Sequence, residues 1–507
     1  MRLRALRPNP FQFKFSSSQS KAHVTTVRHS LLFLLADSYL SLVLQLIGTM
    51  VISRVLTPEE TGIFAVAAVF AALASVFRDF GVGEYLIQEP DLTLKKIRAA
   101  LSLNIMISWP MVILLFALAP FAARFYRSAG VAEVMHVQAL NFLLIPFGAV
   151  TMAYFRRELN FSPVFIAGFA ANATSFIVSI ACALQGMGYM SLAWSSLAGN
   201  AVTVGLAVWF RPSHFPWWPG LEGIGQVFHF GKFASGTYFF GQLGKGAPDM
   251  IIGKAQDLVS VGIFSRAHGL VEIFDRLLVR AVLPICMPYF ARSQREHGSI
   301  LTGYLTGVSF LTVIGWPFLL FMGVVSYAAI RIVYGPQWTA SVALAKVLCA
   351  AGAVDLAYYL AKEALLSIGE AKRGNKLQIG LQLSRVLGLL AVVPFGLSGA
   401  CWGVFVASVA GSWLSHRSLA ATIGLGWKDV ARTCRPSLYI AVVATSPVVA
   451  WTLLQGISEA NFIRFGFGGG ILTVASWLIA LRLFRHPLFD EIVGALSHVR
   501  SLLRRTN

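Results

Sequence analysis

Charged side chains recur inside stretches of this sequence that are otherwise apolar, and these side chains carry its chemistry. Each ionised group costs at least ~2.5–3.5 kcal/mol in hydrocarbon, so each must face protein or a water-filled cavity. Arginine and lysine there can bind a phosphate, and carboxylates can bind a proton or a sodium ion. The polar site that we predict is lined by Arg78, Asp79, Lys245, Asp249, Arg266, Glu272, Arg276, Arg280, Tyr359, Lys362 and Arg385.

Helical spacing brings several of these groups together. Lys245 and Asp249 are four residues apart, within reach of an ion pair. With about 3.6 residues per turn, Glu272, Arg276 and Arg280 form one ridge of a helix. For any one of these residues, the alternative is an internal ion pair that fastens two helices together. A hydrated cavity, in contrast, accounts for the whole set.

Three aspartates are candidates for binding a coupling ion. Asp37, Asp249 and Asp355 each lie in an apolar stretch, where acids often belong to a proton or ion relay. If one continuous helix contains Asp355, Tyr359 and Lys362, the three side chains share a face. The alternative is that Asp355 only neutralises Lys362.

The stretches that hold these residues are about 20 residues long, enough to cross the roughly 30 Å hydrocarbon core of a membrane. With 56% hydrophobic and 12% charged residues, the composition differs from that of soluble proteins, which are about 25% charged. We predict an all-α polytopic membrane protein with about 14 transmembrane helices. They begin near residues 31, 62, 97, 134, 163, 187, 227, 259, 300, 338, 377, 398, 435 and 463.

The basic residues indicate the orientation in the membrane. Most of the 41 lysines and arginines lie in the two termini and in alternate connections between the apolar stretches. By the positive-inside rule these segments are cytoplasmic, which places both termini in the cytosol. The formal net charge of +19 then reflects orientation and contact with anionic lipids, and we predict no binding to nucleic acid.

The two halves of the chain resemble each other at a shift of 200 positions, since Gly62-Ile63-Phe64 aligns with Gly262-Ile263-Phe264 and Arg54 with Lys254. This match predicts two six-helix lobes in a parallel pseudo-repeat plus two C-terminal helices. The predicted boundaries are a basic cytoplasmic tail at 1–30, an N-terminal lobe at 31–210, an interfacial linker at 211–226, a C-terminal lobe at 227–421, two additional helices at 422–485 and a basic cytoplasmic tail at 486–507.

Motifs for enzymatic chemistry are missing from the sequence. It contains no D-x-D sugar-nucleotide motif, no G-x-x-x-x-G-K phosphate loop and no H-E-x-x-H zinc site. The five cysteines lie in or beside apolar stretches without the spacing of metal ligands. We therefore predict no disulfide framework, no metal, no cofactor and no enzymatic activity.

Four segments together resemble a known family. They are SRVLTPEETGIFAVAAVF, FRDFGVGEYLIQ, PDMIIGKAQDLVSVGIFSRAHGL and VLPICMPYFAR, and they are similar to the Wzx-type polysaccharide flippases of the multidrug/oligosaccharidyl-lipid/polysaccharide exporter superfamily. The resemblance implies two six-helix lobes around a V-shaped cavity in the inner membrane of a bacterium. Arg78, Asp79, Asp249 and Arg266 lie on the matching segments.

The activity that this resemblance implies is the flipping of an undecaprenyl-pyrophosphate-linked oligosaccharide from the inner to the outer leaflet. The partners implied are that lipid-linked oligosaccharide, membrane lipids, and a polysaccharide polymerase with its chain-length machinery, around a monomeric flippase. The alternatives are a peptidoglycan-lipid flippase and a multidrug exporter of the same superfamily, although the exporter normally lacks the two extra C-terminal spans. A membrane-bound glycan polymerase or ligase is the alternative from a different class, but it would carry a large external loop, which this chain lacks.

Overall fold

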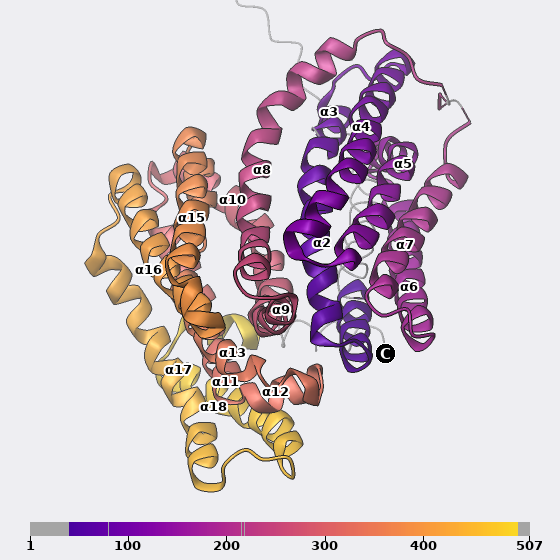
Figure 1. The fold of residues 1–507 in the computed structure, drawn as a ribbon. Coiled ribbons are helices and arrows are strands. Elements are labelled where there is room, and N and C mark those ends of the chain that lie inside the picture. The colour runs from indigo at the N-terminus through magenta and orange to yellow at the C-terminus, as the bar shows by residue number, and fades with distance from the viewer. Residues whose placement is uncertain (1–39, 80, 214, 217, 495–507) are drawn as a thin grey trace, which may run out of the picture.

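The described residues of the computed structural model are 40–79, 81–213, 215–216 and 218–494, and they form helices joined by turns, without a strand among them (Figure 1). This architecture confirms the all-α prediction. Asp37 and the predicted N-terminal tail lie outside the described residues, as does the last part of the C-terminal tail.

The first half of the chain forms helices that begin with Leu40–Val55. Those that follow are α2 (Pro58–Asp79), α3 (Val82–Gln88), α4 (Leu94–Tyr126), α5 (Ala129–Arg157), α6 (Phe161–Leu184) and α7 (Met190–Trp209). A connection, residues 210–223, then leads to the second half, and its described residues form no regular helix.

The second half of the chain begins with one long unbroken helix, which is followed by a long segment of three consecutive helical elements. Its elements are α8 (Ile224–Ala255), α9 (Leu258–Phe274), the π-helix η1 (Asp275–Val279), α10 (Arg280–His297), α11 (Leu301–Val324), α12 (Ser326–Val333), the 3-10 helix η2 (Pro336–Trp338), α13 (Ser341–Leu356), α14 (Ala361–Ser367), α15 (Ala371–Val392), the 3-10 helix η3 (Val393–Phe395), α16 (Gly396–Ile423), α17 (Trp427–Gln455), the π-helix η4 (Arg464–Gly468) and α18 (Gly469–Leu483).

Ten helical stretches among the described residues are long and apolar enough to cross a membrane. One of them, Ala371–Ile423, contains both α15 and α16, and Leu40–Val55 is a shorter apolar helix. The helix α8 and the segment from α9 to α10 are not among the ten. These are the helices in which the charged site residues are concentrated. Protein neighbours cover these charges best, so both segments belong between other helices.

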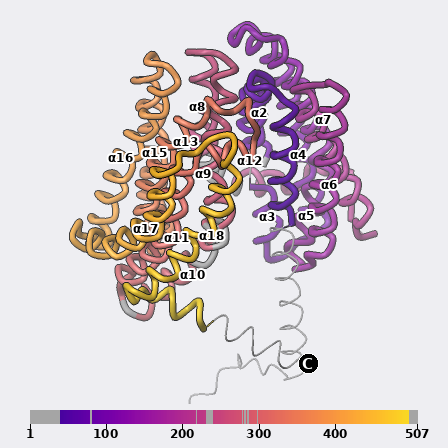
Figure 2. The backbone as a smooth tube through the Cα atoms, turned by 90° about the horizontal axis from the view of Figure 1, so that it is seen from below, coloured from indigo at the N-terminus to yellow at the C-terminus, as the bar shows by residue number. Residues whose placement is uncertain are grey.

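The helices form two groups with α8 and α9 between them. Figure 1 shows α2 to α7 in one group and α13 to α18 in the other, and Figure 2 shows the same division. The helix α2 packs against α8 and α9, whereas α8 also packs against α15. The groups approach each other at the end where α2 and α9 begin, and they diverge toward the end where α4 and α8 begin (Figure 1).

Candidate functional site

Two helical segments of the second half are interrupted side by side. The segment from α9 to α10 passes through the π-helix Asp275–Val279, and α13 ends at Leu356, four turn residues before α14. The Tyr359 hydroxyl donates a hydrogen bond to Oδ1 of Asp275 and so joins the two interruptions. Interrupted helices and π-helical turns are common at binding sites, because they leave backbone and side-chain groups free to contact a ligand.

Four predicted site residues near these interruptions form two ion pairs. Nη2 of Arg276 lies 2.5 Å from Oε2 of Glu272, which confirms that these two groups meet on one ridge. Nη2 of Arg385 lies 3.4 Å from Oδ2 of Asp355. His268, which we did not predict, lies one turn before Glu272, with Nδ1 at 3.6 Å from Oε1.

The predicted shared face of Asp355, Tyr359 and Lys362 is wrong. It assumed one continuous helix, but the turn at residues 357–360 interrupts that helix and changes the direction of the later side chains. Asp355 therefore pairs with Arg385 of α15 instead, and Tyr359 bonds Asp275. Lys362 is half-buried on α14.

Arg266 has aromatic neighbours in place of a carboxylate. Its guanidinium lies 5.4 Å from the ring centre of Tyr334 and 5.0 Å from that of Trp338, both of which are buried. Its Nε is buried without a hydrogen-bond partner, and no described carboxylate forms an ion pair with it. Contacts with aromatic rings contribute about 0.5–2 kcal/mol, less than the several kcal/mol that burying a charge costs. The guanidinium of Arg266 therefore keeps a positive charge that a bound anion can neutralise.

Arg78 lies near the end of α2, where the chain changes direction. Its guanidinium is 5.6 Å from the ring centre of Phe142, and Gly81 then adopts a left-handed conformation with φ of 65° before α3 begins. A left-handed φ of this kind favours glycine, so the break between α2 and α3 is written into the sequence. The side chain of Asp79 lies outside the described ones, as does that of Arg280.

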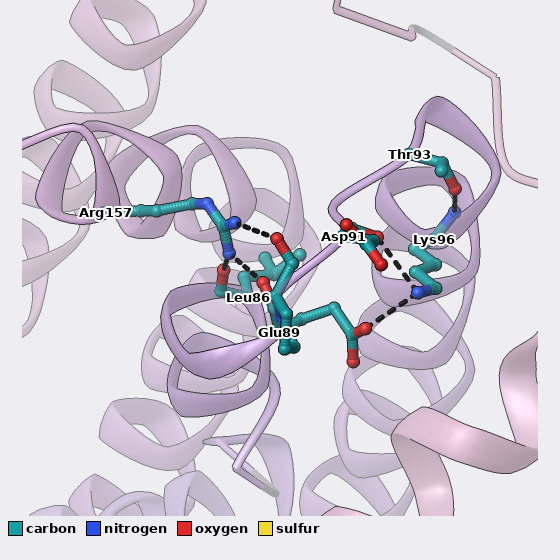
Figure 3. Close-up of polar contacts among 7 residues, drawn as sticks. Leu86, Glu89, Asp91, Thr93, Lys96 and Arg157 are labelled. Carbon is teal, nitrogen blue, oxygen red and sulfur yellow. Dashed lines mark hydrogen bonds and ion pairs between the residues drawn. The ribbon is translucent and has the colours of Figure 1, made fainter. Parts of the chain in front are cut away.

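Arg157, at the end of α5, holds α3 in place (Figure 3). Its guanidinium donates hydrogen bonds to the carbonyl oxygens of Leu86, Glu89 and Pro90, at 2.8, 2.5 and 3.1 Å. Nζ of Lys96 lies 2.7 Å from Oε1 of Glu89, and this hydrogen bond holds the pKa of the Glu89 carboxyl below its usual range. The connection that follows α3 is therefore fixed from two sides.

Lys245 and Asp249 lie on α8, where Lys245 is exposed and Asp249 is half-buried. No ion pair joins them among the described contacts, so the spacing of four residues brings them into reach without a bond. The Tyr126 hydroxyl of α4 donates to the carbonyl oxygen of the next residue, Met250, at 3.3 Å. This contact brings the first half of the chain close to Asp249.

Arg78 and Arg266, two predicted site arginines that lie over aromatic rings, are at different heights in the molecule. At about 1.5 Å per helical residue, Arg266 lies about 12 Å from the start of α9, whereas Arg78 lies about 30 Å from the start of α2. The ion pairs of Arg276 and Arg385 belong to the second half, beside the interrupted helices. Together, these arginines can bind an anionic group and form hydrogen bonds with the hydroxyls of a ligand.

Tyr334 and Trp338 are the neighbours of Arg266 that sequence reasoning missed. They lie about 70 residues further along the chain, on either side of Gly335, where aromatic side chains are typical of membrane-interface anchors. Only the Trp in Pro336–Trp338 hints at a packed turn, and nothing in its spacing connects it with Arg266.

Comparison with known proteins places the chain among polysaccharide biosynthesis proteins. It is 25% identical over 387 residues to the teichuronic acid biosynthesis protein TuaB of Bacillus subtilis, covering 76% of this chain and 80% of that protein. It is 21% identical over 485 residues to the succinoglycan biosynthesis transport protein ExoT of Rhizobium meliloti, covering 91% of each.

A solved structure shares the fold. The lipid II flippase MurJ, in an inward closed conformation, matches with a TM-score of 0.73 and 12% identity, over 91% of this chain and 100% of that chain. Residues 51–343, more than half of the chain, match the family described as "Polysaccharide biosynthesis protein". The resemblance inferred from the four sequence segments is thereby confirmed, and this multi-pass membrane protein belongs to the polysaccharide biosynthesis protein family.

Proposed function

We propose that this protein flips a polyprenyl-pyrophosphate-linked oligosaccharide from the cytoplasmic to the outer leaflet of the bacterial inner membrane, for exopolysaccharide, capsule or O-antigen synthesis. The observation that carries the proposal is Arg266, a half-buried cation whose Nε is buried and which no described carboxylate neutralises. A guanidinium can bind a pyrophosphate through two parallel hydrogen bonds. The pyrophosphate would supply the negative charge that no described side chain supplies to Arg266.

The remaining polar groups fit the sugar part of such a substrate. Each hydroxyl moved into hydrocarbon without a hydrogen bond costs several kcal/mol, which makes unassisted flipping negligible. Groups such as Arg276, Tyr359 and Arg385 can replace the lost water, while the polyprenyl tail stays in the lipid. No covalent bond is made or broken, so the proposed activity is transport and not catalysis.

Several further features belong to this proposal. Both termini face the cytosol, and the lobes have the boundaries predicted from the sequence. The protein acts as a monomer beside a polysaccharide polymerase and its chain-length machinery, which size measurement in detergent and cross-linking in cells would test. Asp249 and Asp355 are the candidates for ion coupling within the described residues. Unchanged ion dependence in vesicles containing Asp355→Asn would remove Asp355 from that role.

The charge of Arg266 supplies the direct test. A hydrogen bond between charged groups contributes about 1.5–3 kcal/mol, so Arg266→Gln should slow flipping by roughly 10- to 150-fold. Arg266→Lys keeps the charge and should retain more activity, though less than the wild type, because it cannot form the two parallel bonds. The measurement is the flipping of a fluorescent polyprenyl-pyrophosphate oligosaccharide in reconstituted vesicles.

Arg292→Gln is the matched control, because Arg292 is exposed on α10 and pairs with Glu296 at 2.7 Å. This variant should flip at the wild-type rate. Wild-type flipping by Arg266→Gln, in a protein that is folded and inserted, would contradict the proposed role of Arg266.

A further inference from the structure

The two halves of the chain touch backbone to backbone where α2 and α9 cross. A β-carbon on Gly62 would lie 1.7 Å from the carbonyl oxygen of Leu258, and a β-carbon on Gly262 would lie 2.0 Å from that of Pro58. Neither distance is possible for real atoms, so only glycine permits this approach. Residues 62 and 262 are 200 positions apart, as are residues 58 and 258, which makes the contact reciprocal.

The helices at this crossing also begin in the same way. Oγ1 of Thr57 accepts a hydrogen bond from the backbone N–H of Glu60 at 3.2 Å, and Oδ1 of Asp257 accepts one from Ser260 at 2.7 Å. Such capping residues hold the first turn of each helix in place. The crossing is therefore formed by two equivalent and rigid helix ends.

Two basic residues, also 200 positions apart, reach across the same crossing. Arg54 donates hydrogen bonds to the carbonyl oxygens of Ile332 and Val333, at 2.5 and 3.3 Å, where α12 ends. Lys254 donates to the carbonyl oxygen of Phe125 at 3.0 Å, where α4 ends. Each cation thus meets the carbonyl end of a helix from the opposite half, where the helix dipole favours positive charge.

Further bonds follow the same reciprocal pattern. The side chains of Gln337 and Trp338 donate to the carbonyl oxygen of Ser53, at 2.5 and 2.7 Å. In the other direction, the Tyr126 hydroxyl donates to Met250. Each half therefore supplies donors to the helix that precedes the crossing in the other half.

We propose that these contacts form a reciprocal latch that holds the outer end of the lobe interface closed, and that Gly62 and Gly262 are the positions that permit closure. That this is the outer end of the interface rests on the proposed function and its topology. Among the described contacts, Arg54 and Lys254 bond only backbone oxygens, so opening the latch separates no ion pair. The same cations can release and regain neutral partners in each transport cycle.

The latch can be tested by a distance measurement that does not depend on transport. Glu59 and Val259 are exposed, lie beside the crossing on α2 and α9, and are also 200 positions apart. Spin labels on Glu59→Cys and Val259→Cys, in a protein whose five native cysteines are replaced, report the separation of the two ends by pulsed electron paramagnetic resonance.

We expect one short distance in the parent protein and a second, longer distance in Gly62→Ala and in Gly262→Ala. Either substitution should suffice, because both contacts lie at one crossing. Arg54→Gln and Lys254→Gln, which add no bulk, should increase the longer population more moderately. Gly205→Ala is the matched control, since a β-carbon there meets no atom within 4 Å.

Distances that stay unchanged in both alanine variants would overturn the latch. Loss of folding in those variants would leave the two glutamine variants to decide, and unchanged distances in these would also overturn it. If the alanine variants show the longer distance while the parent protein flips no glycan lipid, the latch is supported and the proposed substrate is contradicted. The two proposals therefore fail separately.

Discussion

Two arginines about three turns apart on one helical segment differ in what neutralises them. Arg276 has the carboxylate of Glu272 at 2.5 Å, whereas Arg266 has two aromatic rings. A paired arginine is already satisfied and must lose its partner before it binds an anion at full strength. An arginine that packs on aromatic rings keeps its fork of donors available. Arg266 is therefore the stronger candidate for the phosphate contact.

The pair of Glu272 and Arg276 predicts a specific pattern of mutational effects. Their side chains are 41% and 29% exposed, so the coupling free energy should be about 0.5–1 kcal/mol, as for a solvent-screened pair. We expect Arg276→Ala to reduce flipping and the double variant with Glu272→Ala to recover part of it. The check is a double-mutant cycle on unfolding, combined with the flipping rate; strictly additive effects would show that the pair is not coupled.

Arg157 predicts a local loss of stability. Arg157→Ala removes three hydrogen bonds from carbonyl oxygens at and after the end of α3, and each bond to a charged group contributes about 1.5–3 kcal/mol in favourable cases. Hydrogen exchange of residues 82–90 should therefore become faster. Arg156→Ala, at an exposed neighbouring position, serves as the control, and equal exchange in both variants would contradict this role.

Among the elements, the interrupted helices explain how polar groups reach the interior. The π-helix Asp275–Val279 and the turn at 357–360 both depart from regular α-helix, and the bond between Tyr359 and Asp275 joins them. The break between α2 and α3 at Gly81 has the same effect in the first half. Each break changes the direction of the side chains that follow it, and each adjoins predicted site residues.

The connection between α3 and α4 should depend on pH. The hydrogen bond from Lys96 lowers the pKa of Glu89 relative to the unfolded chain. A lowered pKa means that the ionised carboxylate stabilises the folded connection at pH above its unfolded value, and that this contribution disappears as pH falls through the folded value. The protection of residues 89–94 against hydrogen exchange, relative to an unfolded chain at the same pH, should therefore decrease below about pH 4. In Glu89→Gln this decrease should be missing, and its persistence there would assign it to another group.

At the scale of the whole molecule, the basic residues are concentrated at the end where the two groups of helices diverge. The two groups of helices meet where α2 and α9 cross and diverge toward the end where α4 and α8 begin (Figure 1). Basic residues are concentrated at the diverging end, for example Lys95 and Lys96 at the start of α4. By the positive-inside rule, we expect that end to face the cytoplasm.

Labelling from the two sides of the membrane tests this orientation. Cysteine introduced at Met187, in the connection between α6 and α7, should react with an impermeant reagent in intact cells. Cysteine at Arg373, at the start of α15, should react only after the membrane is opened. Both positions are exposed at the protein surface. Labelling of position 373 from outside would contradict the predicted span count and the location of both termini.

Local information in the sequence determined the class of the protein. Hydropathy, charge placement and short motifs predict the apolar helices, the embedded charges and the family, because these properties depend on residues within one helix or one segment. The shift of 200 positions also predicts that Gly62 and Gly262 are equivalent. The ridge of Glu272 and Arg276 follows from helical periodicity, since its members are one turn apart.

Only the tertiary structure decided how the charges are neutralised. Asp355 pairs with Arg385 across 30 residues, and Arg266 packs on rings about 70 residues away, and no local pattern specifies such partners. The chain turns at residues 357–360, where Tyr359 bonds Asp275 from 84 residues away, and the assumption of one continuous helix was wrong. The glycine crossing has the same origin: each glycine is local, but the carbonyl that it accommodates belongs to the other half of the chain.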